Sequence, residues 1–319
     1  MSLASPSPVP PPPRIPSSLP TVTPGDTSSP AARKEAPSAP NTSNSNQAAR
    51  HPPDNERLSR DFHANTSNIP SAPSAPSIDP AEVAYFEALA HRWWDTEGPF
   101  WPLHKLNAFR VVYLRERLCQ ALGRDPTADL PLKGLRLLDI GCGGGILSES
   151  LTHLGARVMG IDVAPKNIRV AELHAQGCGL DLDYRLTSAE ALAQDGAQFD
   201  VVLNMEVVEH VENLPAFLAA CGVLVRPGGV MAVATINRTL AALVIAIFGA
   251  EYVLRWLPKG THHWRKLVKP AEVLAGLGDT FHLVHRTGVR VNPFDRSFHF
   301  TPYLGVNYLL LVQKQPQAA

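Results

Sequence analysis

From Gly134 onward, apolar and polar positions follow two periods that alternate along the chain. Short apolar runs of strand length are followed by stretches in which apolar residues recur every three or four positions, the period of an amphipathic helix. Strands and helices that alternate in this way predict a parallel sheet with helices on both faces. The strands are expected at 136–140, 157–161, 182–186, 199–204 and 230–235, and the helices at 146–154, 165–176, 189–193 and 213–224.

Further apolar segments flank this region. Residues 281–291 and 307–313 are strand candidates, and with them we expect a seven-stranded, mostly parallel sheet. Residues 80–94 and 106–118 carry apolar positions at helical spacing and are expected to form an N-terminal helical lid. The fold class is therefore α/β.

The first 78 residues have a different composition, rich in proline and serine. They hold more than half of the chain's 30 prolines and one aromatic residue, Phe62. Such a segment cannot bury enough apolar surface to offset the entropy cost of ordering it, so we expect it to be disordered. No apolar signal segment follows Met1, and a mitochondrial transit peptide is an alternative although arginine is sparse. The folded domain is expected to span residues 79–315.

Charge and cysteine content narrow the function classes. The formal net charge is 0 and the pI is about 7.2, so nothing electrostatic favours a nucleic-acid partner. The four cysteines show no CxxC spacing, and free thiols in a reducing compartment are the plain interpretation.

The turn after the first predicted strand is the most informative segment. Its spacing is Asp139-x-Gly141-x-Gly143-x-Gly145, and a helical pattern follows at once. Glycine lets a ligand approach the backbone closely at the carboxyl edge of a sheet. A dinucleotide fingerprint needs glycine at the first, third and sixth positions, and neither Gly141 nor Gly143 begins such a register.

A second carboxylate, Asp162, follows the second predicted strand. A carboxylate there can accept hydrogen bonds from both ribose hydroxyls of a nucleoside. Asp162 alone suits NAD equally well, so the glycine register decides between the cofactors. The spacing from Asp139 to Gly145 resembles the first motif of class I S-adenosylmethionine-dependent methyltransferases, whose cofactor carries no phosphate, and Asp162 supports that resemblance. A tight strand–helix turn without a ligand is the structural alternative.

Longer runs make the resemblance specific. The segments Phe86-Glu87-Ala88, Arg92-Trp93-Trp94-Asp95 and Pro102-Leu103-His104 look like the N-terminal signature of the ubiquinone biosynthesis O-methyltransferase family. The match covers roughly residues 82–314. It continues through the runs 139–149, 205–211, 249–255, 258–262, 269–272 and 306–308.

The resemblance implies a class I methyltransferase Rossmann-like fold and transfer of a methyl group from S-adenosylmethionine to polyprenylated phenols. The implied substrates are 2-polyprenyl-6-hydroxyphenol and 3-demethylubiquinol. The expected cofactor-binding residues are Arg110, Asp139, Gly141, Gly143, Asp162 and Met205. A guanidinium at Arg110 can fork onto the cofactor carboxylate, and the polarizable Met205 can pack against adenine or the sulfonium. A surface arginine on an amphipathic helix is the alternative for Arg110.

Three candidate catalytic residues, Glu206, Glu209 and His210, follow the fourth predicted strand. Positions i, i+3 and i+4 of a helix share one face, so we expect the three side chains to converge. Two carboxylates and an imidazole suit Mg²⁺, Mn²⁺ or Zn²⁺, and a metal chelated by catechol oxygens would lower the pKa of the phenol. Without a metal, His210 can act alone as the general base. An ion-pair cluster that orders the loop is the remaining alternative.

Residues 239–268 are expected to form an apolar and basic insertion. The apolar run 240–250 is shorter than the roughly 20 residues that span a bilayer, and a basic stretch with two tryptophans follows it. This composition fits a segment lying in a membrane interface, and a buried helix over the active site is the alternative. We expect a cytoplasmic protein on the inner membrane face, or alternatively one in the mitochondrial matrix.

Two other functions stay open at this point. One is a catalytically silent subunit that scaffolds a quinone-biosynthesis complex, because proline-rich tails often dock partners. The other is a class I methyltransferase for a different small molecule. The intact Asp139, Gly141 and Asp162 argue against the first, and the run 259–262 with its apolar neighbour argues against the second.

Overall fold

The computed structural model describes residues 92–317, except residues 99, 244–263, 293–294 and 296. The tail expected at residues 1–78 and nearly all of the helix expected at 80–94 lie outside the described residues. The boundary between tail and domain therefore stays a prediction.

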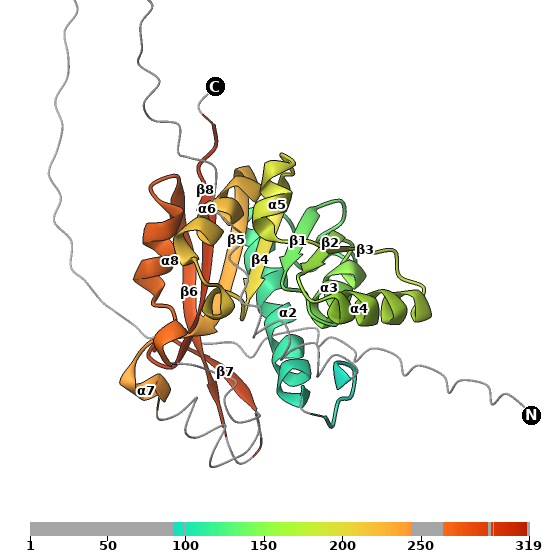
Figure 1. The fold of residues 1–319 in the computed structure, drawn as a ribbon, viewed down its shortest axis with the longest axis horizontal. Helices are drawn as coiled ribbons and strands as arrows, with labels where there is room; N and C mark the ends of the chain where they lie inside the picture. The colour runs from blue at the N-terminus through green and yellow to red at the C-terminus, as the bar shows by residue number, and fades with distance from the viewer. Residues whose placement is uncertain (1–91, 99, 244–263, 293–294, 296, 318–319) are drawn as a thin grey trace, which may run out of the picture. The chain divides into compact units, whose positions relative to one another are not determined.

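Eight strands form one sheet in the order β3-β2-β1-β4-β5-β8-β6-β7 (Figure 1). The pairs among β1 to β5 are parallel, and β8, β6 and β7 join them in antiparallel fashion. The strands are β1 (Arg136–Ile140), β2 (Arg157–Asp162), β3 (Asp183–Leu186), β4 (Phe199–Met205), β5 (Val225–Ile236), β6 (Phe281–Val291), β7 (Phe298–Thr301) and β8 (Asn307–Lys314).

The expected count of seven strands is wrong by one, because the short β7 was not predicted. Its four residues pair with the end of β6, from Gly288 opposite Thr301 to Val291 opposite Phe298. A strand of four residues shows too little alternation of apolar and polar positions to be detected in the sequence. The ring of Phe300 stacks on Phe109 at a centroid distance of 4.0 Å, so β7 is held by packing against the long N-terminal helix.

The helices occur at the predicted places in the alternating region. Those described are α2 (Trp101–Ala121), α3 (Ile146–His153), α4 (Pro165–Gly177), α5 (Ala189–Gln194), α6 (Leu214–Leu224), α7 (Leu240–Ala242) and α8 (Pro270–Leu277), with the 3-10 turns η2 (Val208–His210) and η4 (Trp264–Lys266). The helix predicted at 106–118 begins earlier, at Trp101, since Pro102 is tolerated in a first turn whose N–H groups have no intrahelical partner.

The core lies on both faces of the parallel strands. Leu137 and Val201 pack with α2 and α3 on one face, whereas Leu138 and Val202 pack with α5, α6 and α8 on the other. All four side chains are fully buried. This explains why β1 and β4 appear in the sequence as mostly apolar runs. Within the described residues, no helix has the length and apolarity needed to cross a membrane.

Candidate active site

The predicted cofactor residues meet at the carboxyl edge of three neighbouring strands. β1 lies between β2 and β4, and Ile140 pairs with both Ile161 and Asn204. The residues that follow these strand ends therefore lie along one edge, where open α/β sheets bind their ligands. Asp162 closes β2 and Met205 closes β4.

The glycine turn needs its glycines for two reasons. Gly141, Gly143 and Gly145 have φ values of 67°, 55° and 87°, in the left-handed region that favours glycine. A Cβ at Gly143 would also lie 2.6 Å from the ring of Trp93, and one at Gly141 would lie 2.6 Å from Val207. The spacing found in the sequence is thus a steric requirement of this turn.

Asp162 ties the glycine turn to the next helix. Its Oδ2 accepts a hydrogen bond from the backbone N–H of Gly143 at 2.9 Å. Its Oδ1 accepts from the backbone N–H of Ala164 at 2.8 Å and from Nδ2 of Asn167 at 3.3 Å. Burial raises the pKa of Asp162, and the hydrogen bonds from Ala164 and Gly143 oppose that rise. A ribose placed here would share the carboxylate with these donors.

Asp139 points into the protein. It is 2% exposed, and the hydroxyl of Ser148 donates to its Oδ2 at 2.6 Å. Burial raises the pKa of Asp139 to about 6, although the Ser148 hydrogen bond acts in the opposite direction. The hydrogen bond between Asp139 and Ser148 therefore joins β1 to the first turn of α3.

Arg110 and Glu206 form an ion pair with 2.8 Å between Nη2 of Arg110 and Oε1 of Glu206. Arg110 is buried, so the alternative of a surface arginine is wrong. Glu206 is the one non-glycine residue with a positive φ, 58°, in the described part of the chain. Because α2 supplies Arg110, the ion pair connects this helix to the strained turn after β4.

The expected helix face of Glu206, Glu209 and His210 does not form. Glu206 lies outside any helix, and only the single 3-10 turn η2 (Val208–His210) contains the other two. Among the described residues, the three potential ligands whose ligand atoms gather within 4.8 Å are Glu149, His174 and Cys178 instead. The i, i+3, i+4 argument fails because a positive φ at Glu206 turns the chain before a helix can begin.

The carboxylate of Glu209 is nevertheless unusual. The residue is 3% exposed, and neither carboxylate oxygen has a hydrogen-bond partner. Burial and the neighbouring charge of Glu206 raise the pKa of Glu209 to about 7, while His210 acts to lower it. A buried carboxylate without donors is stable as the protonated acid or beside a cation.

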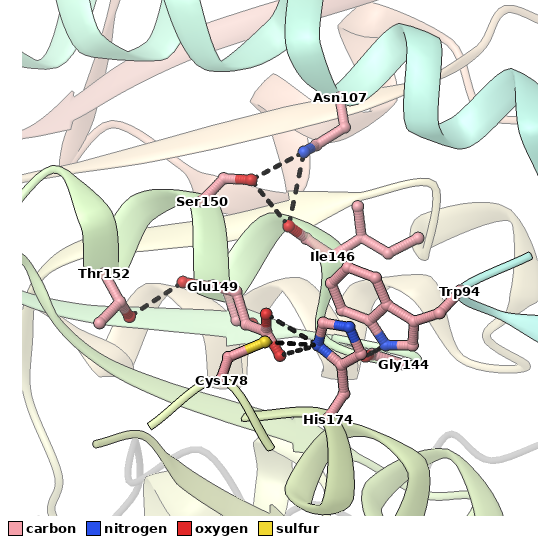
Figure 2. Close-up of polar contacts among 10 residues, drawn as sticks. Trp94, Asn107, Gly144, Ile146, Glu149, Ser150, Thr152, His174 and Cys178 are labelled. Atoms are coloured by element: carbon pink, nitrogen blue, oxygen red, sulfur yellow. Dashed lines mark hydrogen bonds and ion pairs between the residues drawn. The ribbon is translucent and has the colours of Figure 1, made fainter. Parts of the chain in front are cut away.

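Two tryptophans cover the glycine turn. Trp93 stacks on Phe100 at 4.0 Å, and its Nε1 donates to Oδ1 of Asn167 at 2.9 Å. The Nε1 of Trp94 donates to the carbonyl oxygen of Gly144 at 2.8 Å (Figure 2). Sequence reasoning missed Asn167 altogether, because its role depends on contacts with residues distant along the chain.

Comparison with known proteins agrees with this geometry. A family model described as a methyltransferase domain matches residues 138–233. The ubiquinone biosynthesis O-methyltransferase of Sinorhizobium fredii is 52% identical over 239 residues, which are 75% of this chain and 96% of that protein. The enzyme of the same name from Brucella ovis is 51% identical over the same shares.

The fold also occurs among solved structures. A crystal structure of magnesium protoporphyrin IX methyltransferase from Synechocystis, with bound SAH, is similar to this chain with a TM-score of 0.54. The sequence identity is 22%, and the match covers 74% of this chain and all of that one. The similarity confirms the α/β class expected from the sequence.

Proposed function

The chain belongs to the ubiquinone biosynthesis O-methyltransferase family, and we propose that it methylates phenolic hydroxyls of polyprenylated intermediates. It is an S-adenosylmethionine-dependent methyltransferase. The proposed acceptors are 2-polyprenyl-6-hydroxyphenol and 3-demethylubiquinol. The observation that carries the proposal is the glycine turn held by Asp162, at the edge of the sheet where the nucleoside of the cofactor would lie.

In this proposal the cofactor lies across the strand ends. Asp162 accepts hydrogen bonds from the ribose, the methionyl part follows the turn at Gly141 and Gly143, and Met205 packs against adenine or the sulfonium. The guanidinium of Arg110 binds the methionyl carboxylate. Because Glu206 now holds Arg110 at 2.8 Å, the cofactor carboxylate would compete with that side chain.

The chemistry is an in-line displacement at the sulfonium methyl group. The phenolate oxygen forms a bond to the methyl carbon while the carbon–sulfur bond breaks, and S-adenosylhomocysteine leaves. The protein contributes alignment of the two reactants and removal of the phenolic proton. Without a metal, we assign proton removal to His210 with Glu209. The pKa of Glu209, about 7, suits a proton acceptor near neutrality.

We further propose that the site binds a divalent metal, Mg²⁺ or Zn²⁺. The unpaired, buried carboxylate of Glu209 is its support, since a cation would satisfy both oxygens. Glu206 and His210 would complete the ligand set, and Glu206 would have to leave Arg110 to do so. When bound, the metal would supply Lewis-acid polarisation that lowers the pKa of the phenol.

Peripheral membrane association is also proposed, because a polyprenylated substrate dissolves in the bilayer. Most of the apolar and basic insertion lies outside the described residues. At its start, Leu240 is 76% exposed and Leu243 is 36% exposed, so two apolar side chains face solvent there. Replacing Ile245 and Phe248 with Asp should release the protein from anionic liposomes in flotation. Retention of that variant on liposomes would exclude this segment as the anchor.

Methyl transfer from labelled S-adenosylmethionine tests the function directly. We expect turnover on 3-demethylubiquinol and much less on soluble catechols. Binding of the cofactor without turnover on any phenol would favour the silent scaffold, and binding of a nicotinamide dinucleotide instead would overturn the proposal. Deletion of residues 1–78 with unchanged turnover would exclude a catalytic role for the tail.

A further inference from the structure

We propose that Glu149, His174 and Cys178 form a structural site for one zinc ion, separate from the residues assigned to methyl transfer. The three side chains come from two helices, Glu149 from α3 and the other two from α4. Their ligand atoms all lie within 4.8 Å of one another. Figure 2 shows the carboxylate, the imidazole and the thiol pointing toward one another beside Trp94.

The distances suit tetrahedral coordination. Zinc–nitrogen, zinc–oxygen and zinc–sulfur bonds of about 2.0 to 2.3 Å place nitrogen and sulfur ligands about 3.6 Å apart, and nitrogen and oxygen ligands about 3.3 Å apart. The Nδ1 of His174 lies 3.7 Å from Sγ of Cys178. It lies 2.9 Å and 3.0 Å from the two oxygens of Glu149. The sulfur–nitrogen distance already fits, and the carboxylate must retreat by only about half an ångström.

The residue types and their spacing also suit zinc. His174 and Cys178 are four positions apart on α4, which places them on the same face of that helix. Imidazole, thiolate and carboxylate are the ligand types that zinc uses in proteins. Three protein ligands leave a fourth position for water. Cys178 is half-buried whereas the other three cysteines are buried, so an ion and this water can reach it from solvent.

The residues around the three ligands orient the imidazole of His174 and leave the negative charge of Glu149 without a lysine or arginine partner among the described ion pairs. The ring of Trp94 stacks on that of His174 at 3.4 Å with an interplanar angle of 2°, which fixes the imidazole plane. Glu149 is 5% exposed. Among the ion pairs of the described residues, its partner is His174, and no lysine or arginine pairs with it. A cation between these side chains would neutralise a buried carboxylate.

The location gives the ion a structural role. Trp94, which stacks on His174, donates to the carbonyl oxygen of Gly144 in the glycine turn. Glu149 lies in the first turn of α3, the helix that begins directly after that turn. An ion joining α3 to α4 would therefore stiffen the wall of the turn.

Cobalt titration of the metal-free full-length chain tests the site. Cobalt replaces zinc with the same tetrahedral preference, and its bond to a thiolate gives a charge-transfer band in the near ultraviolet. We expect this band to saturate at one equivalent and to disappear in Cys178→Ser. The set Glu206, Glu209 and His210 contains no sulfur, so an ion bound there cannot produce the band.

Matched variants separate ligation from misfolding. Glu149→Gln and His174→Asn should weaken cobalt binding at least tenfold, whereas Glu172→Gln and His153→Asn, which change exposed residues of α4 and α3, should bind as the wild type does. Zinc should raise the thermal midpoint of the wild type by more than it raises that of folded Cys178→Ser, because the wild type has one zinc site more than the variant. Absence of the band in the wild type, or its persistence in Cys178→Ser, would overturn the proposal.

Discussion

Replacing Asp139 by asparagine should stabilise the ligand-free protein at neutral and alkaline pH. Asp139 is 2% exposed, and the hydroxyl of Ser148 is its hydrogen-bond donor. Burial raises its pKa from 3.8 to about 6, so the fold favours the protonated acid over the carboxylate. Asparagine keeps the shape and an acceptor oxygen for Ser148 without carrying a charge.

The size of the effect follows from the shift in pKa. Since the folded-state pKa lies above the unfolded one, the contribution of Asp139 to stability is complete below pH 3.8 and is lost as pH rises through 6. A shift of this size corresponds to about 3 kcal/mol once pH is well above 6. At pH 5 roughly half of that difference is expected, and at pH 4 less than about 1 kcal/mol.

Urea unfolding of both proteins between pH 4 and pH 8, with a chelator present and no cofactor, would measure the difference. Other buried carboxylates, such as Asp162 and Glu209, are common to both proteins and largely cancel. Asp129→Asn, at an exposed position, is the matched control and should change little at any pH. If Asp139→Asn differs from the wild type by the same amount at pH 4 and pH 8, the argument from buried charge is refuted.

Three further changes test the site. Asp162→Ala should weaken S-adenosylmethionine binding by about 1–3 kcal/mol in isothermal titration, because a charged hydrogen-bond partner is lost, and unchanged affinity would contradict the ribose role. Gly144→Ala would place a Cβ 2.5 Å from the Cβ of Trp93 and should also weaken cofactor binding. In the control Gly222→Ala, the added Cβ lies 3.5 Å from the ring of Phe281, and cofactor binding should not change. Equal affinities of the two variants for the cofactor would contradict the clash with Trp93. Glu209→Ala should remove any stimulation of methyl transfer by Mg²⁺, and activity that still falls on adding chelator would count against ligation.

The sequence predicted the sheet well where one local pattern determines the outcome. The central strands β1 and β4 are buried on both faces, so each appears as a mostly apolar run. The glycine turn is recognised by its spacing alone. Asp162 was found because its place at the end of β2 is a consequence of topology. The four-residue β7 was missed because its pairing with β6 depends on a hairpin with little local signal.

The candidate site was harder to predict because it depends on backbone angles and long-range contacts. Nothing in the letters Met-Glu-Val-Val-Glu-His shows that Glu206 takes a positive φ, which removes the helix on which the ligand argument relied. The partner of Arg110 lies 96 positions away, and the donor to the carbonyl of Gly144 lies 50 positions away. Such contacts follow from packing of the whole domain rather than from local periodicity.

The hydrogen bonds of Asn167 have a practical consequence. This side chain joins Oδ1 of Asp162 to the indole nitrogen of Trp93, so it connects the edge of the sheet to a chromophore. A nucleoside whose ribose hydroxyls hydrogen-bond to the carboxylate of Asp162 would alter the polarity around the indole of Trp93. The protein thereby carries an intrinsic optical reporter, and emission from Trp93 would register occupancy without any added dye.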